Sequence, residues 1–175
     1  EWSRAKRHSI EFKSYWKDYL FGKQVGGLGF DVLSLTKEYQ EMMEKQVNLL
    51  DLKGGDIIGD MGGGTGNLTH FILDRIALKR VEGKDSLFPK HKIIQIDFVP
   101  EILEKSKEKH RKLLREIYVP SIKLEYLGAD LNIKKGNHVL PFRENCFTKI
   151  IGSLLISYLE EPAKVVSEFY RTLKP

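Results

Sequence analysis

The chain has 175 residues, of which 41% are hydrophobic and 30% are charged, as is ordinary for one soluble globular domain. No apolar run approaches the roughly 18 residues that a membrane span needs, and the amino-terminal residues lack a signal-peptide core. A single cysteine, Cys146, excludes an intramolecular disulfide framework and predicts a reducing, cytoplasmic location. The formal net charge of +5 permits nucleic-acid binding but does not argue strongly for it.

Apolar and aromatic side chains are concentrated in the first 24 residues. They recur three or four positions apart at Phe12, Tyr15, Trp16, Tyr19 and Leu20, a spacing that predicts an amphipathic helix. This stripe either packs on the rest of the domain or forms a lid over a bound ligand. The following residues 26–29, Gly-Gly-Leu-Gly, have no preceding strand and are interpreted as a flexible loop.

A second helix is predicted over residues 35–50. Its inward side is expected to carry Leu35, Tyr39, Met42, Met43, Gln46, Leu49 and Leu50. Methionines at helical spacing are typical of a packed core. We therefore expect two parts, an amino-terminal helical extension or lid over residues 1–50 and the main domain over residues 51–175.

A glycine-rich turn follows a short β-prone run at residues 56–60. Gly62, Gly63, Gly64 and Gly66 lie within five positions, and a helix is predicted from Leu68 to about residue 80. Glycine destabilises regular structure by about 0.5–1 kcal/mol relative to alanine, so such a cluster indicates a turn with positive φ or a close approach to a ligand. Strand, glycine turn and helix together are typical of nucleotide-cofactor sites, where a helix N-terminus faces the ligand.

The rest of the chain alternates between strands and helices. Strands are predicted at residues 91–96, 121–127 and 147–153, and helices at residues 100–117 and 162–173. The second strand ends at Asp97, and the third leads to Asp130. This alternation predicts a parallel sheet with right-handed crossovers and a ligand site at the carboxyl ends of its strands.

The helix over residues 100–117 is rich in lysine and arginine. Acidic residues are interleaved with the basic ones, and Glu101 with Lys105 and Glu108 with Lys112 have the four-residue spacing of surface ion pairs. We interpret this stretch as a solvated helix face, with a functional basic patch as the alternative.

Two common glycine motifs do not fit the turn. A phosphate-binding P-loop requires Lys-Ser/Thr after its last glycine, whereas Gly66 is followed by Asn67 and Leu68. The dinucleotide fingerprint GxGxxG, started at Gly62, would require a third glycine at the position of Asn67. The spacing present is Asp60-x-Gly-x-Gly-x-Gly.

With the motifs that follow it, this spacing resembles class I S-adenosylmethionine-dependent methyltransferases, in the type 11-like branch that includes enzymes of ubiquinone and menaquinone biosynthesis. The matching segments are residues 60–66, residues 94–103 around Asp97, Ala129-Asp130-Leu131, Leu140-Pro141-Phe142, Phe147-Thr148 and the closing Arg171-Thr172-Leu173-Lys174-Pro175. Together they cover roughly residues 50–175.

The resemblance implies an α/β, Rossmann-like fold with a parallel sheet of at least four strands in the order 3-2-1-4, flanked by helices. It implies S-adenosyl-L-methionine as cofactor, a small-molecule methyl acceptor and no metal. The cofactor-binding residues that it implies are Asp60, Met61, Gly62, Gly63, Gly64, Gly66, Asp97, Phe98, Ala129, Asp130, Leu131 and Ser153.

The three acidic residues of this set have different expected roles. Asp60 holds the turn or meets the cofactor's ammonium group, and Asp97 accepts hydrogen bonds from both ribose hydroxyls. Asp130 accepts from the adenine amino group. Helix capping by Asp97 and a loop hydrogen bond by Asp130 are the structural alternatives. No catalytic residue is assigned, and His70 and His138 are interpreted as surface or packing residues.

The chain departs from the family pattern at several points. Gly59 replaces a larger aliphatic residue, and Thr148 replaces the aspartate that follows the phenylalanine of the fourth strand. The family's sheet has seven strands and this sequence supplies four, so we expect the chain to lack the carboxyl-terminal part of the domain.

Two other functions stay open. A nucleic-acid methyltransferase is less favoured, because residues 151–154 lack the Asn/Asp-Pro-Pro-Tyr/Phe motif and Cys146 does not follow proline. The other alternative is a cofactor-binding module without turnover.

Overall fold

The parallel sheet begins with β1 (Ile57–Met61), which pairs with β2 (His91–Asp97) on one side and β4 (Lys149–Ile151) on the other. The computed structural model describes residues 10–21, 29–83, 90–117, 122–133 and 140–175. Adding β3 (Ile122–Gly128) beside β2 gives the order β3-β2-β1-β4, with every pair parallel. The register places Asp60 opposite Gln95 and Ile151, so β1 and its neighbours end at one edge. The predicted fold class and strand order are confirmed.

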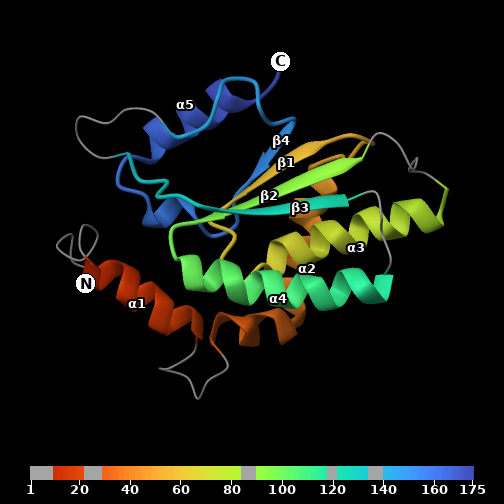
Figure 1. Cartoon of the computed structure of the whole chain (residues 1–175), viewed down its shortest axis with the longest axis horizontal. Coiled ribbons are helices and arrows are strands. Elements are labelled where there is room, and N and C mark those ends of the chain that lie inside the picture. The colour runs from red at the N-terminus through yellow and green to blue at the C-terminus, as the bar shows by residue number, and fades with distance from the viewer. Residues whose placement is uncertain (1–9, 22–28, 84–89, 118–121, 134–139) are drawn as a thin grey trace.

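Helices cover both faces of this sheet (Figure 1). On one face lie α2 (Lys37–Leu49), α3 (Asn67–Val81) and α4 (Pro100–Ile117), and on the other lies α5 (Pro162–Thr172). The amino-terminal α1 (Ile10–Phe21) lies beside the first turn of α4, and a 3₁₀ helix, η2 (Gly29–Leu35), connects it toward α2. A short 3₁₀ helix, η3 (Ile156–Tyr158), follows β4.

Three groups of buried side chains hold these layers together. Ile58 and Ile93 of the sheet pack with α2 and α3, whereas Met61 and Ile96 pack with residues near α5. Trp16 and Leu20 of α1 pack against Val99 and Ile102 at the start of α4. No described helix has the length and apolar character needed to cross a membrane.

The inward side of α2 differs from the prediction. Tyr39, Met43 and Val47, each four residues apart, are buried. Leu49 is 85% exposed, because two residues after Val47 the helix has turned by about 200° and the side chain faces the opposite side. Leu35 is 77% exposed, since it ends η2 and does not belong to α2.

The fourth strand is shorter than the predicted residues 147–153. Phe147 pairs with Leu173 as an isolated bridge outside β4, and the residue is 1% exposed. A Cβ atom on Gly59 would lie 3.1 Å from the Phe147 ring and 2.8 Å from the Met61 side chain. Glycine at position 59 therefore makes room for Phe147.

Thr148 joins the start of β1 to the start of β4. Its hydroxyl donates to Asp56 Oδ1 at 2.8 Å and accepts from the backbone N–H of Ile57 at 2.8 Å. These bonds lie at the amino ends of the strands, opposite to the edge where ligands bind in such sheets, so Thr148 has a structural role.

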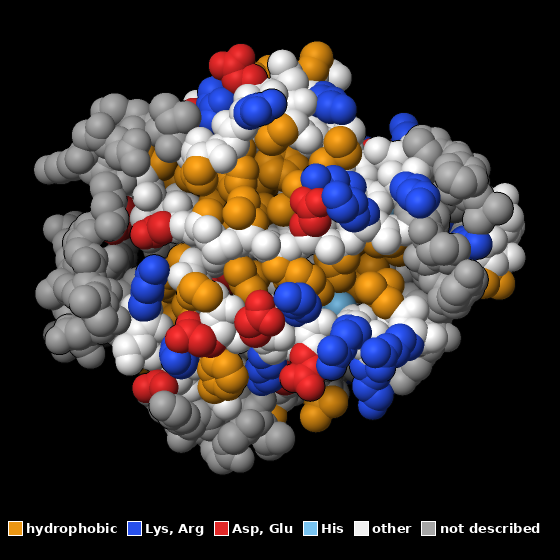
Figure 2. All heavy atoms as spheres, in the orientation of Figure 1, with side chains coloured by type: hydrophobic (Ala, Val, Ile, Leu, Met, Phe, Trp, Pro, Cys, Tyr) orange, Lys and Arg blue, Asp and Glu red, His pale blue; other side chains and the backbone are white. Residues whose placement is uncertain are grey.

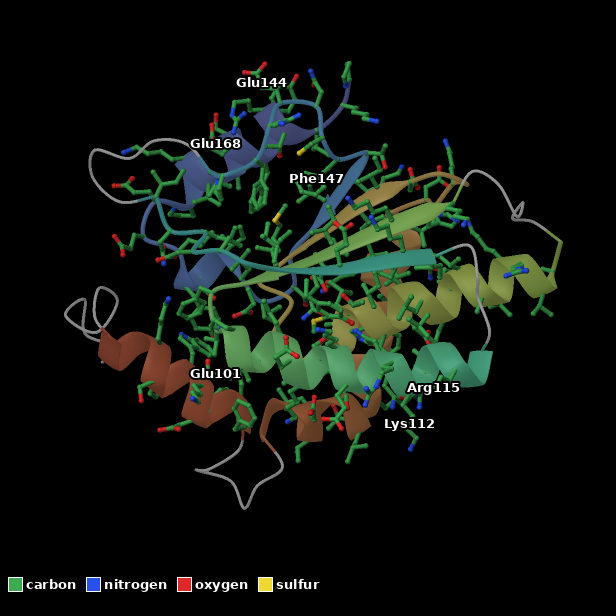
Figure 3. The ribbon with its side chains drawn as sticks, viewed as in Figure 1. Glu101, Lys112, Arg115, Glu144, Phe147 and Glu168 are labelled. Carbon is green, nitrogen blue, oxygen red and sulfur yellow. The ribbon has the colours of Figure 1, made fainter. Side chains whose placement is uncertain are left out.

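The ion pairs of α4 also differ from the prediction. Glu101 pairs with Lys17 of α1 at 2.6 Å, and Lys105 pairs with Asp31 of η2 at 3.1 Å. The first half of α4 is thus a contact surface for the amino-terminal segment. Lys112 and Arg115 lie at its other end, where basic side chains gather at the lower right of Figure 2 (Figures 2 and 3).

Candidate cofactor site

A cavity lies at the carboxyl ends of β1 and β2, where the alternation of elements predicts it. About 930 Å³ of space lies between its walls, a volume that includes the open solvent at its mouth. Its lining comes from α1, α2, the end of β1, the glycine turn, the start of α3, the end of β2, the segment after β3 and the segment after β4. The lining residues are Trp16, Leu20, Tyr39, Asp60, Gly62, Gly63, Gly64, Thr65, Asn67, Leu68, Asp97, Phe98, Leu131, Asn132, Ser153, Leu154, Leu155, Tyr158 and Leu159.

The glycines of the turn have two different functions. Gly64 has φ +53° and lines the cavity, and a Cβ atom there would meet nothing closer than 3.9 Å. Gly66 has φ +80°, and a Cβ atom there would lie 2.1 Å from Ser106 Oγ and 2.5 Å from His110 Cε1. Gly64 therefore opens the turn to a ligand, whereas Gly66 allows α4 to pack against the turn.

A buried polar network fixes the carbonyl groups of this turn. Gln95 donates to the Gly64 carbonyl at 2.8 Å and accepts from Ser106 Oγ at 2.6 Å. His110 Nε2 lies 2.9 Å from the Gly66 carbonyl, which can only accept, so Nε2 carries the proton. Burial lowers the pKa of His110 to about 4, so the ring is neutral at pH 7.

Asp97 connects the end of β2 to the glycine turn. Its Oδ2 accepts from the Gly64 N–H at 3.0 Å and its Oδ1 accepts from the Val99 N–H at 2.9 Å. Burial raises its pKa, and these backbone donors oppose the rise. A carboxylate has about four acceptor positions, which is more than these backbone donors occupy.

Asp60 is buried between the turn and the start of α3. Its Oδ2 accepts from Thr69 Oγ1 at 2.6 Å. Burial, with the negative charge of Asp97 as a smaller cause, raises the pKa of Asp60 to about 6. A cationic group beside Asp60 would favour its ionised form.

Three buried polar atoms of cavity-lining residues have no hydrogen-bond partner among the described residues. They are Asp60 Oδ1, Asn67 Nδ2 and Ser153 Oγ. Buried polar atoms in native proteins are nearly always paired, so each of these requires an explanation. A polar ligand bound in the cavity would supply partners to all three.

Aromatic side chains from distant parts of the chain meet at the cavity. The rings of Trp16 in α1 and Tyr158 in η3 are in edge contact, with centroids 4.7 Å apart. Leu154, which lines the cavity beside them, has φ +54°, an unusual backbone conformation for leucine and one that concentrates at functional sites.

Comparison with known families identifies the family to which this chain belongs. The profile of a family described as a methyltransferase domain matches residues 59–175, about two thirds of the chain. The chain belongs to this methyltransferase domain family. No curated protein matches the sequence.

Solved structures share the fold of this methyltransferase domain at low sequence identity. A candidate methyltransferase of Bacillus halodurans C-125 has a TM-score of 0.55 and 19% identity, over 77% of this chain and 47% of its own. A candidate S-adenosyl-L-methionine-dependent methyltransferase of Methanococcus maripaludis has a TM-score of 0.55 and 19% identity, over 93% of this chain and 59% of its own. The [4+2]-cyclase SpnF has a TM-score of 0.54 and 19% identity, over 78% of this chain and 42% of its own. The chain thus spans about half the length of these structures.

The structure brings together most of the predicted site residues of the methyltransferase domain. Eight of the twelve line the cavity, namely Asp60, Gly62, Gly63, Gly64, Asp97, Phe98, Leu131 and Ser153. Met61, Gly66, Ala129 and Asp130 do not line it. The Met61 side chain points into the core, and Asp130 is exposed and accepts from the Asn132 N–H at 3.0 Å.

Several lining residues were not predicted. Tyr39, Thr65 and Asn67 carry polar groups but were not assigned to the site. Thr65 is an unspecified position of the glycine motif, and Asn67 counted only as a mismatch to the dinucleotide fingerprint. His70 pairs with Asp74 at 3.3 Å, and His138 lies outside the described residues, as do residues 26–28 of the predicted glycine loop. No cluster of metal-ligating side chains occurs within the described part of the chain.

Proposed function

We propose that this methyltransferase domain binds S-adenosyl-L-methionine in the cavity and transfers a methyl group to a small-molecule acceptor. The observation that carries the proposal is the group of three unpartnered buried atoms, of Asp60, Asn67 and Ser153, in a cavity at the glycine turn. The cofactor, when bound, supplies an activated methyl group, so the protein's task is to bind and orient the two reactants.

The acidic residues at the strand ends fit the polar parts of this cofactor. In the proposal, Asp60 accepts from the ammonium group, and Asp97 uses its remaining acceptor positions for the ribose hydroxyls. Phe98 and Leu131 supply apolar surfaces to the adenine. The predicted bond from the adenine amino group to Asp130 has less support, because Asp130 lies outside the cavity lining.

The acceptor is proposed to be small and uncharged where it meets the cavity. Trp16, Leu20, Leu154, Leu155 and Tyr158 form an apolar part of the lining, and no lysine or arginine lines it among the described residues. We assign α1 the role of a lid, because Trp16 and Leu20 line the cavity and Trp16 contacts Tyr158. In Figure 3, Lys112 and Arg115 lie at the end of α4 remote from Glu101 and α1, which does not favour a nucleic-acid acceptor.

The proposal includes no dedicated general base. The titratable residues of the lining are Asp60, Asp97, Tyr39 and Tyr158. Both aspartates are assigned to the cofactor, and burial raises the pKa of both tyrosines, which makes them poor bases at neutral pH. The acceptor would then attack with a nucleophile that needs no proton removed by the protein. A cytoplasmic location stays a prediction from the single cysteine.

Calorimetric titration with S-adenosylhomocysteine, followed by transfer of a labelled methyl group to a small-molecule extract, tests the proposal. We expect binding, with a loss of roughly 10- to 100-fold for Asp97→Ala, since hydrogen bonds to charged groups contribute about 1.5–3 kcal/mol. Asp74→Asn, on the exposed side of α3, is the matched control and should bind as the wild type does. Absence of binding by the wild-type chain would refute the assignment.

The transfer assay separates an enzyme from a binding module. A fold shared with a protein named for a cyclisation shows that architecture alone does not give the reaction. Tight binding with no labelled product from any fraction would support a cofactor-binding module without turnover, whereas labelled product identifies a methyltransferase.

A further inference from the structure

Asn67 is placed and oriented as a hydrogen-bond donor in the cavity. It is the first residue of α3, is 6% exposed and lines the cavity. Its Oδ1 accepts from Lys109 Nζ. A lysine ammonium group can only donate, so the amide orientation is determined. Nδ2 makes no hydrogen bond of normal geometry with the described residues, although the Asn67 side chain is close enough to Tyr39 to oppose the rise in the pKa of its hydroxyl.

Lys109 is held in place by the amino-terminal segment. Its Nζ lies 3.4 Å from Asp31 Oδ1, in η2. Asp31 Oδ1 also accepts from Thr65 Oγ1 at 2.6 Å, and Asp31 Oδ2 pairs with Lys105 at 3.1 Å. Burial would raise the pKa of Asp31, but Thr65 and the two lysines lower it overall, so Asp31 is ionised at pH 7. One carboxylate therefore connects η2, the glycine turn and α4.

Two of the unpartnered atoms in the cavity have complementary hydrogen-bonding roles. Asp60 presents an unpartnered acceptor and Asn67 an unpartnered donor, and both line the same cavity. Gly66, the residue before α3, has no side chain to cap that helix, whose N-terminus favours anions. An acceptor at the end of β1 and a donor at the N-terminus of α3 match the two ends of a zwitterionic amino acid.

We propose that Asn67 Nδ2 donates to the carboxylate of the cofactor's amino acid tail, and that Asp31 and Lys109 orient Asn67 for this contact. Asn67 is then a binding residue, and Asp31 and Lys109 are positioning residues. The inference rests on the proposed function. It makes the amino-terminal segment part of the cofactor site through hydrogen bonds, in addition to the apolar contact of α1.

A ligand lacking only the carboxylate tests this contact. Affinities for S-adenosylhomocysteine and for its decarboxylated analogue are measured by calorimetry on the wild type, Asn67→Asp and Asn67→Ala. Asn67→Asp should weaken the affinity for S-adenosylhomocysteine roughly 10- to 100-fold and change the affinity for the decarboxylated ligand by less than about threefold. The aspartate keeps an acceptor for Lys109 and places a negative charge at a helix N-terminus, and both effects oppose the cost of burying its carboxylate. Urea denaturation of both variants shows whether each is folded before its affinity is compared.

The positioning role is tested by a double-mutant cycle. Asp31→Asn should weaken S-adenosylhomocysteine about 3- to 10-fold in the wild-type background and have no further effect in Asn67→Ala, because its effect passes through Asn67. A purely structural role of Asp31 would give the same loss in both backgrounds and would overturn the relay.

The outcomes separate the two proposals. If the wild type binds S-adenosylhomocysteine and Asn67→Asp weakens both ligands equally, or neither, the carboxylate contact is wrong and the proposed function stands. If the wild type binds neither ligand, the proposed function is wrong and the contact at Asn67 is refuted with it.

Discussion

The stability of the cofactor-free Asp60→Asn variant, relative to that of the wild type, should increase as the pH rises. The pKa of Asp60 is raised from 3.8 to about 6, mainly by burial. Between about pH 4 and pH 6 the folded state therefore binds more protons than the unfolded state, so the free energy of unfolding falls with rising pH and levels off near pH 7. An asparagine does not titrate and shows no such fall.

The expected size follows from the pKa difference. A rise of about two units corresponds to roughly 3 kcal/mol, of which about 2–3 kcal/mol develops between pH 4 and pH 7.5. The free energy of unfolding of Asp60→Asn, minus that of the wild type, should increase by this amount over the same range. The same variant should bind S-adenosylhomocysteine more weakly, because the proposed acceptor for the ammonium group is lost.

Urea denaturation at pH 4, 5, 6 and 7.5 measures the difference. Thr69→Val is the matched variant, since it removes the hydroxyl that lowers the pKa of Asp60 and should extend the fall in stability to higher pH. A difference between Asp60→Asn and the wild type that does not vary with pH would show that Asp60 titrates normally, and the reasoning from burial would be refuted.

Three further predictions follow from particular contacts. Gly66→Ala should destabilise the protein by about 3 kcal/mol or more through strain and overlap with Ser106, whereas Gly64→Ala, with open space at its Cβ, should lose about 1–2 kcal/mol; urea denaturation compares them. Arg171→Lys should lose about 1–2 kcal/mol in thermal unfolding, because the guanidinium group bridges Glu168 and the Phe142 carbonyl; an unchanged Tm would contradict this. Trp16→Ala should weaken S-adenosylhomocysteine roughly 2- to 10-fold in calorimetry and Trp16→Phe less; equal affinities would remove α1 from the site.

The fold was largely readable from the sequence because its local signals agree. Isoleucine-rich runs at Ile57–Ile58 and Ile93–Ile96 form buried strands, and the helices between them begin and end within a few residues of the predicted limits. The errors occur where position depends on packing. Leu49 was assigned to the inward side of its helix but faces outward, and Phe147 was assigned to a strand but fills the space over Gly59.

The site was readable to a smaller extent. Asp60, Gly64 and Asp97 occur in motifs whose spacing reflects the strand-turn-helix geometry, so their presence in one cavity could be predicted. Asn67 and Asp31 could not, because their roles depend on Lys109, which is 42 residues from Asn67 in the sequence and 78 from Asp31. Hydrogen bonds that join side chains on three separate elements leave no pattern in the local sequence.

The difference between the two kinds of lining residue explains why the sequence indicates the cofactor and not the acceptor. Ionic and hydrogen-bonding groups must occur at set places relative to a glycine turn, so few residue types can fill those positions. The apolar part of the lining, from Trp16, Leu155 and Tyr158, excludes water and shapes the space, and many combinations of side chains can do this. If Asn67 and Asp31 act as proposed, α1 and η2 share both tasks: α1 supplies apolar surface and η2 orients a polar contact. Removal of the amino-terminal segment would then weaken cofactor binding as well as exposing the cavity, a coupling that the Asp31 and Trp16 variants separate into its polar and apolar parts.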